Sequence, residues 1–88
     1  MNLSVEISMY PLQDGYKPKI EEFLAHINER ANGVEIRTSN MSTRLFGEFD
    51  AVNALLNDAM KVSMEKYGKI VFVAKFLQGD ARDLKSYD

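Results

Sequence analysis

Cysteine is absent from the 88 residues of this chain, and histidine occurs only once. A chain without cysteine has no disulfide framework and no thiolate metal site. A single histidine leaves most metal and nucleophile chemistries without their parts. We therefore predict no metal site, no cofactor and no catalytic residues, and we expect a cytoplasmic protein because nothing indicates an oxidising compartment.

An excess of positive charge and a long apolar run are also missing. The chain has 11 Lys+Arg against 13 Asp+Glu, a net charge of -2, whereas binding nucleic acid through bulk charge needs a basic excess. No apolar run approaches the roughly 18 residues that span a bilayer, so we predict no membrane insertion. The start MNLSVEISMY lacks a basic segment, and we expect no signal peptide. The glycines Gly33, Gly47, Gly68 and Gly79 are isolated, which excludes a glycine-rich phosphate loop.

The remaining composition is that of an ordinary globular domain, with 45% hydrophobic and 27% charged residues. We predict a single domain over residues 1–88, with a polar C-terminal tail at 78–88. A chain this short buries only about 60–65% of the surface that it exposes when unfolded. With no disulfide or metal to compensate, association with further copies is the natural way to bury more.

Hydrophobic spacing switches between a period of two and a period of 3.6, which predicts four strands and two helices. The expected strands are 3–12, 34–38, 42–48 and 69–77, and the expected helices are 17–31 and 50–67. We expect Pro18 at the first position of the first helix and Asp50 as the N-cap of the second. We also expect four methionines to fill the core, namely Met9, Met41, Met60 and Met64.

The element order βαββαβ predicts an α+β fold, the ferredoxin-like sandwich. Each helix joins two strands through a right-handed crossover, and the short link between the second and third strands is a hairpin. The compact solution is a four-stranded antiparallel sheet of order 4-1-3-2 with both helices on one face.

The other face of this sheet is the first place to look for function. It presents Ser4, Glu6, Ser8 and Tyr10 from the first strand and Arg44, Phe46 and Glu48 from the third. The last strand adds an apolar row, either Val71, Val73 and Leu77 or Ile70, Phe72 and Phe76. This face is too apolar to be left wholly in water, so we expect a dimer interface, a small-molecule site, or both.

Several polar residues have an ordinary structural explanation. Glu6 is expected to pair with Arg44 on the adjacent strand, although it can instead face a cationic ligand. His26 is expected on the surface, because no carboxylate or nucleophile is placed beside it by spacing. The RNA-recognition domain has the same topology but needs several outward aromatics on its third strand. Here that strand reads STRLFGEF, with one outward aromatic and an acidic neighbour, so this interpretation fails.

Three segments in order, ISMYPL, NMSTRLFGEFDAV and VFVAKF, carry a family resemblance. Over about Val5 to Phe76 the chain resembles the YkoF-like thiamine/hydroxymethylpyrimidine-binding proteins and the related short thiamine-binding domain proteins. The strongest pieces are the pair Tyr10–Pro11 and the segment Ser42–Gly47, which an acidic helix cap follows.

The resemblance implies a domain that binds the aminopyrimidine of thiamine or of its hydroxymethylpyrimidine precursor without turning it over. YkoF-type proteins carry two such domains in tandem, whereas the short relatives carry one and assemble as dimers or tetramers. A homodimer or homotetramer is therefore implied, joined through the open sheet face or a sheet edge. The departure from the tandem pattern leaves the geometry of a composite site open.

Six residues are the predicted ligand-binding site. Tyr10, Ser42 and Thr43 match the motif positions of the family, whereas Ser8, Phe46 and Glu6 follow from the expected facing of the strands. We expect Tyr10 or Phe46 to stack on the pyrimidine and the hydroxyls of Ser8, Ser42 or Thr43 to bind its nitrogens. A carboxylate, Glu6 or Glu48, would offset the charge of the thiazolium.

Two other functions remain open. The first is a small dimeric ferredoxin-like enzyme of the antibiotic-biosynthesis-monooxygenase type, which needs polar groups inside its pocket. The predicted inner rows are apolar, and an internal cavity lined by Thr43, Tyr67 or His26 would favour this enzyme. The second is a regulatory or interaction domain, which predicts a fully covered open face with no cleft beside Tyr10.

Overall fold

The central strand β1 (Asn2–Pro11) organises the structure, a computed structural model that describes residues 1–82. Its side chains alternate as predicted, with Leu3, Val5, Ile7 and Met9 buried on one face. The strand ends at Pro11, which has no N–H to donate to a continuing ladder.

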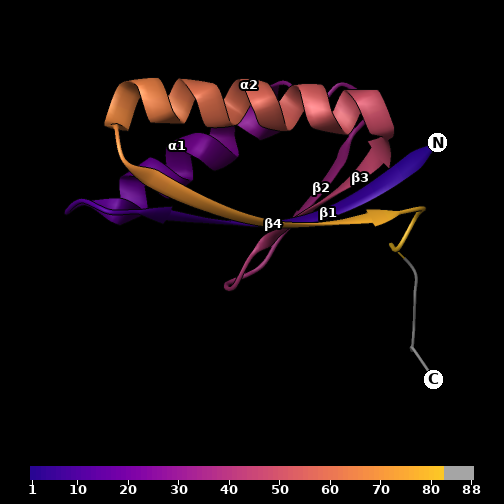
Figure 1. Cartoon of the computed structure of the whole chain (residues 1–88), viewed down its shortest axis with the longest axis horizontal. Coiled ribbons are helices and arrows are strands. Elements are labelled where there is room, and N and C mark those ends of the chain that lie inside the picture. The colour runs from indigo at the N-terminus through magenta and orange to yellow at the C-terminus, as the bar shows by residue number, and fades with distance from the viewer. Residues whose placement is uncertain (83–88) are drawn as a thin grey trace.

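Three further strands complete one antiparallel sheet of order β2-β3-β1-β4. They are β2 (Glu35–Thr38), β3 (Thr43–Glu48) and β4 (Ile70–Gln78). Figure 1 shows both helices on one side of this sheet. The ferredoxin-like fold and the strand order predicted from the sequence are therefore confirmed. No helix among residues 1–82 is long and apolar enough to cross a membrane.

Helix α1 (Tyr16–Glu29) is close to the predicted 17–31, but Pro18 occupies its third position and not its first. This position costs little, because the first four N–H groups of a helix have no intrahelical acceptor. The helix buries Phe23 and Ile27 against the sheet. Gly33, which the sequence marks as a stop, has a left-handed φ of 90° in the turn that leads to β2.

Helix α2 (Phe49–Tyr67) begins one residue before Asp50, so the prediction that Asp50 is its N-cap is wrong. Glu48 is the N-cap, and its carboxylate accepts hydrogen bonds from the backbone N–H groups of Asp50 at 2.6 Å and Ala51 at 3.2 Å. Strand β3 thus passes directly into the helix. Asp50 lies in the first turn, where the helix dipole still favours a negative charge.

The hydrophobic core lies between the helices and the sheet. Its buried members are Leu3, Val5, Ile7, Met9, Phe23, Ile27, Val34, Leu45, Val52, Leu55, Leu56, Ala59 and Ile70. Met9 and Met60 pack there as expected, but Met41 is 86% exposed and Met64 is 44% exposed. The prediction that all four methionines fill the core is wrong for these two. Met41 lies in the β2–β3 turn, and in α2 the neighbouring Ser63 takes the buried position instead of Met64.

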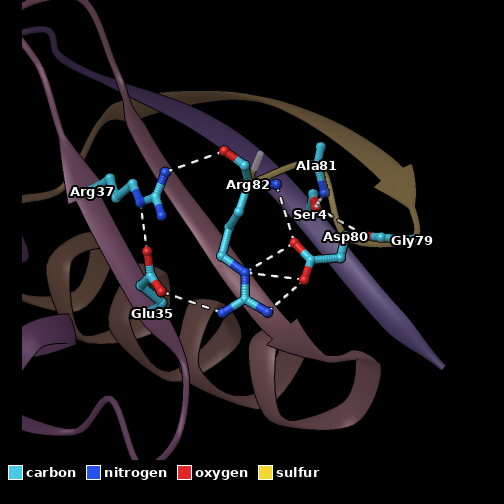
Figure 2. A network of polar contacts seen from close by, with 7 residues as sticks. All are labelled: Ser4, Glu35, Arg37, Gly79, Asp80, Ala81 and Arg82. Atoms are coloured by element: carbon cyan, nitrogen blue, oxygen red, sulfur yellow. Dashed lines mark hydrogen bonds and ion pairs between the residues drawn. The ribbon is translucent and has the colours of Figure 1, made fainter. Parts of the chain in front are cut away.

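Residues 79–82, here called the C-terminal strap, follow β4 and return across the open face of the sheet (Figure 2). Gly79, with φ 105°, allows the turn, and its N–H donates to the Asn2 carbonyl at 2.8 Å. The Ser4 hydroxyl then fastens the strap twice. It donates to the Gly79 carbonyl at 2.8 Å and accepts from the Ala81 N–H at 2.9 Å.

The far end of the strap is held by charge. Arg82 forms ion pairs with Asp80 and with Glu35 of β2, and its carbonyl accepts from the Arg37 guanidinium at 3.2 Å (Figure 2). The Arg37 guanidinium also lies 5.4 Å from the centre of the Phe46 ring. Phe46 is only 4% exposed beneath these contacts, although its face of β3 still presents Arg44 and Glu48 to solvent. The strap forms the start of the predicted 78–88 tail, whose remaining residues lie outside the described part of the chain.

Candidate functional site

Strand β1 is longer than its neighbour β3, and this difference creates a gap in the sheet. The pairing of β1 with β3 ends where Ile7 faces Thr43, whereas its pairing with β4 continues to Pro11. Residues 8–11 therefore have a strand on one side only. The β2–β3 turn bends to the side of the sheet opposite the helices and leaves this edge uncovered (Figure 1).

A pocket of about 470 Å³ occupies the gap. Three segments line it: the last half of β1 with the residues that follow, the first half of α1, and the β2–β3 turn with its flanking residues. The lining residues are Ile7 to Leu12, Tyr16, Ile20, Phe23, Leu24 and Thr38 to Thr43. Its volume falls within the range typical of small-molecule sites, about 300–1,000 Å³.

One wall of the pocket carries two serine hydroxyl groups that already donate hydrogen bonds within the protein. Ser8 donates to the Met41 carbonyl at 3.2 Å, and Ser42 donates to the Glu6 carboxylate at 2.9 Å. A serine hydroxyl has one proton and two lone pairs. Both serines can therefore offer a ligand only their lone pairs, so this wall attracts a molecule with N–H or O–H donors.

The remaining lining is aromatic and aliphatic. Tyr10 is 53% and Tyr16 is 61% exposed, so both rings remain available to a ligand. Phe23 is buried and packs against Phe72 with ring centres 5.2 Å apart, which gives the pocket a fixed apolar side. Flat aromatic surfaces of this kind favour planar ligands, because rings stack in offset or tilted arrangements.

Four of the six predicted site residues come together at this pocket, namely Ser8, Tyr10, Ser42 and Thr43. Thr43 is buried, and its hydroxyl lies 3.2 Å from that of Thr38. Glu6 lies outside the lining but is bound to the pocket through its hydrogen bond with Ser42. Phe46 is not part of the pocket; it is only 4% exposed, and the Arg37 guanidinium lies 5.4 Å from the centre of its ring.

Glu6 forms its ion pair with Lys75 of β4, at 3.6 Å, and not with Arg44 as predicted. Both residues face Glu6 directly, Arg44 from β3 and Lys75 from β4, so the strand register alone does not decide between them. Glu6 is half-exposed and Lys75 mostly exposed, which makes this a surface pair of small energetic value.

His26, which was expected on the surface, is largely covered, with 14% of its side chain exposed, and a carboxylate from the other helix lies beside it. Its Nε2 lies 2.7 Å from Asp58 Oδ2 on α2, and its Nδ1 lies 3.3 Å from Arg30. Asp58 is 32 residues away in the sequence, so the spacing within one helix gave no sign of it. Asp58 and Arg30 also line a second, smaller pocket of about 240 Å³ between the two helices.

Among residues 1–82, no charged side chain lines the main pocket, and the ionisable groups of its lining are the hydroxyls of Tyr10 and Tyr16. The carboxyl groups with lowered pKa values lie elsewhere. Hydrogen bonds from Lys66 and then Tyr67 lower the pKa of Glu22, and Arg82 lowers the pKa of Asp80 from 3.8 to about 2. Within residues 1–82 no group of three His, Asp or Glu side chains is arranged to hold a metal ion.

These observations bear on both rival functions. Thr43 lines the pocket, but Tyr67 and His26 do not, so only one of the three residues named for an enzyme cavity is present. A purely structural domain predicts no cleft beside Tyr10, whereas the pocket lies there. Sequence reasoning missed Tyr16 and the residues Ser39, Asn40 and Met41. Their part in the site depends on where α1 begins and on how the turn bends.

No protein-family model and no curated protein matches the sequence. Solved structures do match. A protein of Streptococcus pneumoniae is 22% identical, with a TM-score of 0.83 over 96% of this chain and 93% of its own. A Thermotoga maritima protein, named for a candidate role in thiamine biosynthesis or salvage, is 14% identical with a TM-score of 0.74 over 86% and 82%.

A Bacillus cereus protein, named as a domain of unknown function, DUF77, is 16% identical with a TM-score of 0.73 over 97% of this chain and 83% of its own. At such low identity these likenesses establish a shared fold. They are consistent with the fold that the resemblance to the YkoF-like proteins implies.

Proposed function

We propose that this protein binds thiamine or its hydroxymethylpyrimidine precursor without chemical turnover, as a homo-oligomer in the cytoplasm. The observation that carries the proposal is the pocket at the end of β1. It gathers four residues chosen from the sequence for this ligand, Ser8, Tyr10, Ser42 and Thr43, in a cavity of suitable size. The thiamine-related name of the Thermotoga maritima neighbour supports the same ligand class.

The chemistry of the pocket suits an aminopyrimidine. This ring is flat, carries an amine that donates hydrogen bonds, and has ring nitrogens that accept them. Tyr10 and Tyr16 supply exposed rings for stacking. The lone pairs of the Ser8 and Ser42 hydroxyls can accept hydrogen bonds from the amine of the ligand. The uncharged lining suits a neutral ring, because burying an unpaired charge is costly.

Glu6 gives the site a means to distinguish thiamine from its precursor. Thiamine adds a cationic thiazolium to the pyrimidine, and Glu6 lies next to the pocket behind Ser42. A thiazolium that leaves the pocket toward the open face meets this carboxylate. The contact is half-exposed, so its effect is expected to weaken at high salt.

Binding without turnover is supported by what the lining contains. General acid–base catalysis uses groups with a pKa near the working pH, most often histidine or a carboxylate. The pocket offers two tyrosine hydroxyls and the alcohols of serine and threonine. The carboxyl groups with lowered pKa values lie away from the pocket: Glu22, which is bonded to Lys66 and Tyr67, and Asp80 of the C-terminal strap.

Self-association is supported by the part of the open face that the strap leaves uncovered. Strand β4 is at the edge of the sheet and presents Val71, Val73 and Leu77, each about half-exposed. Tyr10 of β1 is paired with Val71 of β4 and extends this apolar row toward the pocket. An edge strand with such a surface is a natural site for a second copy of the chain.

Isothermal titration calorimetry tests the proposal with two probes, thiamine and hydroxymethylpyrimidine. We expect both to bind, and we expect Ser42→Ala to weaken both by roughly 5- to 10-fold, the value of one or two hydrogen bonds. Ser63→Ala on α2, a buried serine outside the lining, is the matched control and should leave affinity unchanged. Failure of both probes to bind at millimolar concentration would overturn the proposal.

The role of Glu6 has its own test. Glu6→Gln removes the charge and keeps an acceptor for Ser42. It should weaken thiamine by about 2- to 5-fold, in keeping with a half-exposed ion pair, and leave the neutral precursor within twofold. Equal losses for both probes would show that Glu6 acts through Ser42 and not on the thiazolium.

Sedimentation velocity tests self-association. Val73→Lys places a charge in the middle of the exposed β4 row and should convert the oligomer to a monomer. Lys61→Ala, on the solvent-exposed side of α2, is the control and should leave the mass unchanged. A wild-type protein that stays monomeric at hundreds of micromolar would contradict this part of the proposal.

A further inference from the structure

The backbone of β1 points alternately to its two neighbours, and three hydrogen bonds fix which residues point where. The Asn2 carbonyl accepts from Gly79 and the Leu12 N–H donates to Lys69, both on the β4 side. The Met1 carbonyl accepts from Phe49, on the β3 side. Since successive residues of a strand alternate, the odd-numbered residues of β1 direct their N–H and C=O groups toward β3.

Met9 is the first odd-numbered residue beyond the end of the β1–β3 ladder. Ile7 is paired with Thr43, and the same register would place Met41 opposite Met9. The β2–β3 turn bends away at this point, however, and the Met41 carbonyl accepts from the Ser8 hydroxyl instead, at 3.2 Å. The N–H and C=O of Met9 therefore point across an edge that β3 leaves open, and Met9 lines the pocket at this edge.

We propose that the Met9 backbone N–H and C=O together bind the edge of a planar heterocycle that carries a hydrogen-bond donor beside an acceptor. This inference rests on the proposed function and assigns recognition of the pyrimidine to the backbone of Met9. In an antiparallel ladder one residue exchanges two hydrogen bonds with a single partner residue. One planar group with an adjacent donor and acceptor can take that partner's place.

An aminopyrimidine has such an edge, with its amine next to a ring nitrogen. The ring nitrogen accepts from the Met9 N–H, and the amine donates to the Met9 carbonyl. The second hydrogen of the amine remains for a lone pair of Ser42 or Ser8. The Met9 side chain packs in the core on the helix-covered face of the sheet, so the proposed contacts are made by the backbone of this residue.

A peptide strand is a less suitable occupant of the same edge. Pro11 is the next residue directed to this side, and it has no N–H to offer. An added strand would thus find one complete pair of hydrogen bonds, at Met9, before the chain turns toward α1. Three enclosing segments line the pocket, which favours a small molecule over an extended chain.

Amide hydrogen exchange measured by NMR tests the free protein first. The Met9 amide should exchange about tenfold or more faster than the amides of Ile7 and Tyr10. Ile7 is bonded to β3 and Tyr10 to β4, so both are matched controls within the same strand. A Met9 amide as protected as these two would overturn the inference. Protection that rises with protein concentration would indicate a second copy at this edge and would overturn it as well.

Titration with hydroxymethylpyrimidine then tests the bound state. The Met9 amide should shift and its exchange should slow, while the exchange rates of the Ile7 and Tyr10 amides, which are already bonded within the sheet, stay unchanged. An analogue with hydrogen in place of the amine leaves the Met9 carbonyl unpaired and should bind roughly 5- to 150-fold more weakly.

The outcomes separate this inference from the proposed function. Hydroxymethylpyrimidine that binds without affecting Met9, or an analogue that binds equally well, overturns the role of Met9 and leaves the proposed function standing. Failure of hydroxymethylpyrimidine and thiamine to bind at all overturns both.

Discussion

Ser4 holds the C-terminal strap, and its replacement by alanine should destabilise the protein far more than its size suggests. The hydroxyl is buried at 5% exposure and makes two hydrogen bonds, to the Gly79 carbonyl at 2.8 Å and from the Ala81 N–H at 2.9 Å. Ser4→Ala removes both and leaves two backbone groups without their partner.

The magnitude follows from these two bonds. An intramolecular hydrogen bond contributes about 1 kcal/mol net, and an unsatisfied buried group costs about 1–3 kcal/mol. Relaxation of the strap will let water reach part of this region, so we expect a loss of about 2 kcal/mol in the free energy of unfolding. In a domain of this size that lowers the melting temperature by roughly 8–16 °C.

Urea unfolding of Ser4→Ala and Ser63→Ala gives a matched comparison. Ser63 is also 5% exposed, but it lies within α2, away from the C-terminal strap. Ser63→Ala should be near neutral, because alanine has the higher helix propensity. Equal midpoints for the two variants would refute the assignment of this stability to the strap.

Two further predictions concern a backbone position and a carboxyl group. Gly68→Ala should lower the free energy of unfolding by about 1–3 kcal/mol, measured by urea unfolding, because φ there is 83°, a region that side chains rarely adopt. An unchanged midpoint would contradict that strain. NMR titration of Asp80 should show a midpoint near pH 2, against 3.8 for a free group. Because the folded pKa is lowered, its stabilising contribution is complete above pH 3.8 and is lost as the pH falls through about 2. In Arg82→Ala the midpoint should return toward 3.8, and a midpoint that stayed near 2 would assign the shift to another group.

The fold could be predicted because each element carries its own hydrophobic period. The alternation of β1 and the apolar stripes of the two helices are local properties of the sequence, and the connection rules leave few topologies. The errors at Asp50 and Pro18 displace helix ends by a residue or two. Such ends depend on which nearby side chain reaches the first N–H groups, and here Glu48 does.

The site was only partly predictable, because it depends on contacts between distant segments. The facing of Ser8 and Tyr10 follows from strand periodicity. The pocket beside them exists because β1 extends beyond β3, and the bend of the β2–β3 turn does not follow from hydrophobic spacing. Phe46 was assigned to the site because its strand position faces outward, but Arg37 lies over its ring and is itself bonded to Arg82 of the strap. The contact between His26 of α1 and Asp58 of α2 was likewise unpredictable, because it depends on how the two helices pack together.

Amide chemical-shift mapping shows where an aminopyrimidine binds, which we place in the pocket at the end of β1. On titration with hydroxymethylpyrimidine, we expect shifts confined to residues 8–12, the start of α1 and residues 39–43. Residues 71–77 of β4 and the C-terminal strap should change little. Shifts centred on the open face of β4 would place the ligand outside this pocket, and the absence of any shift would show that the protein does not bind it.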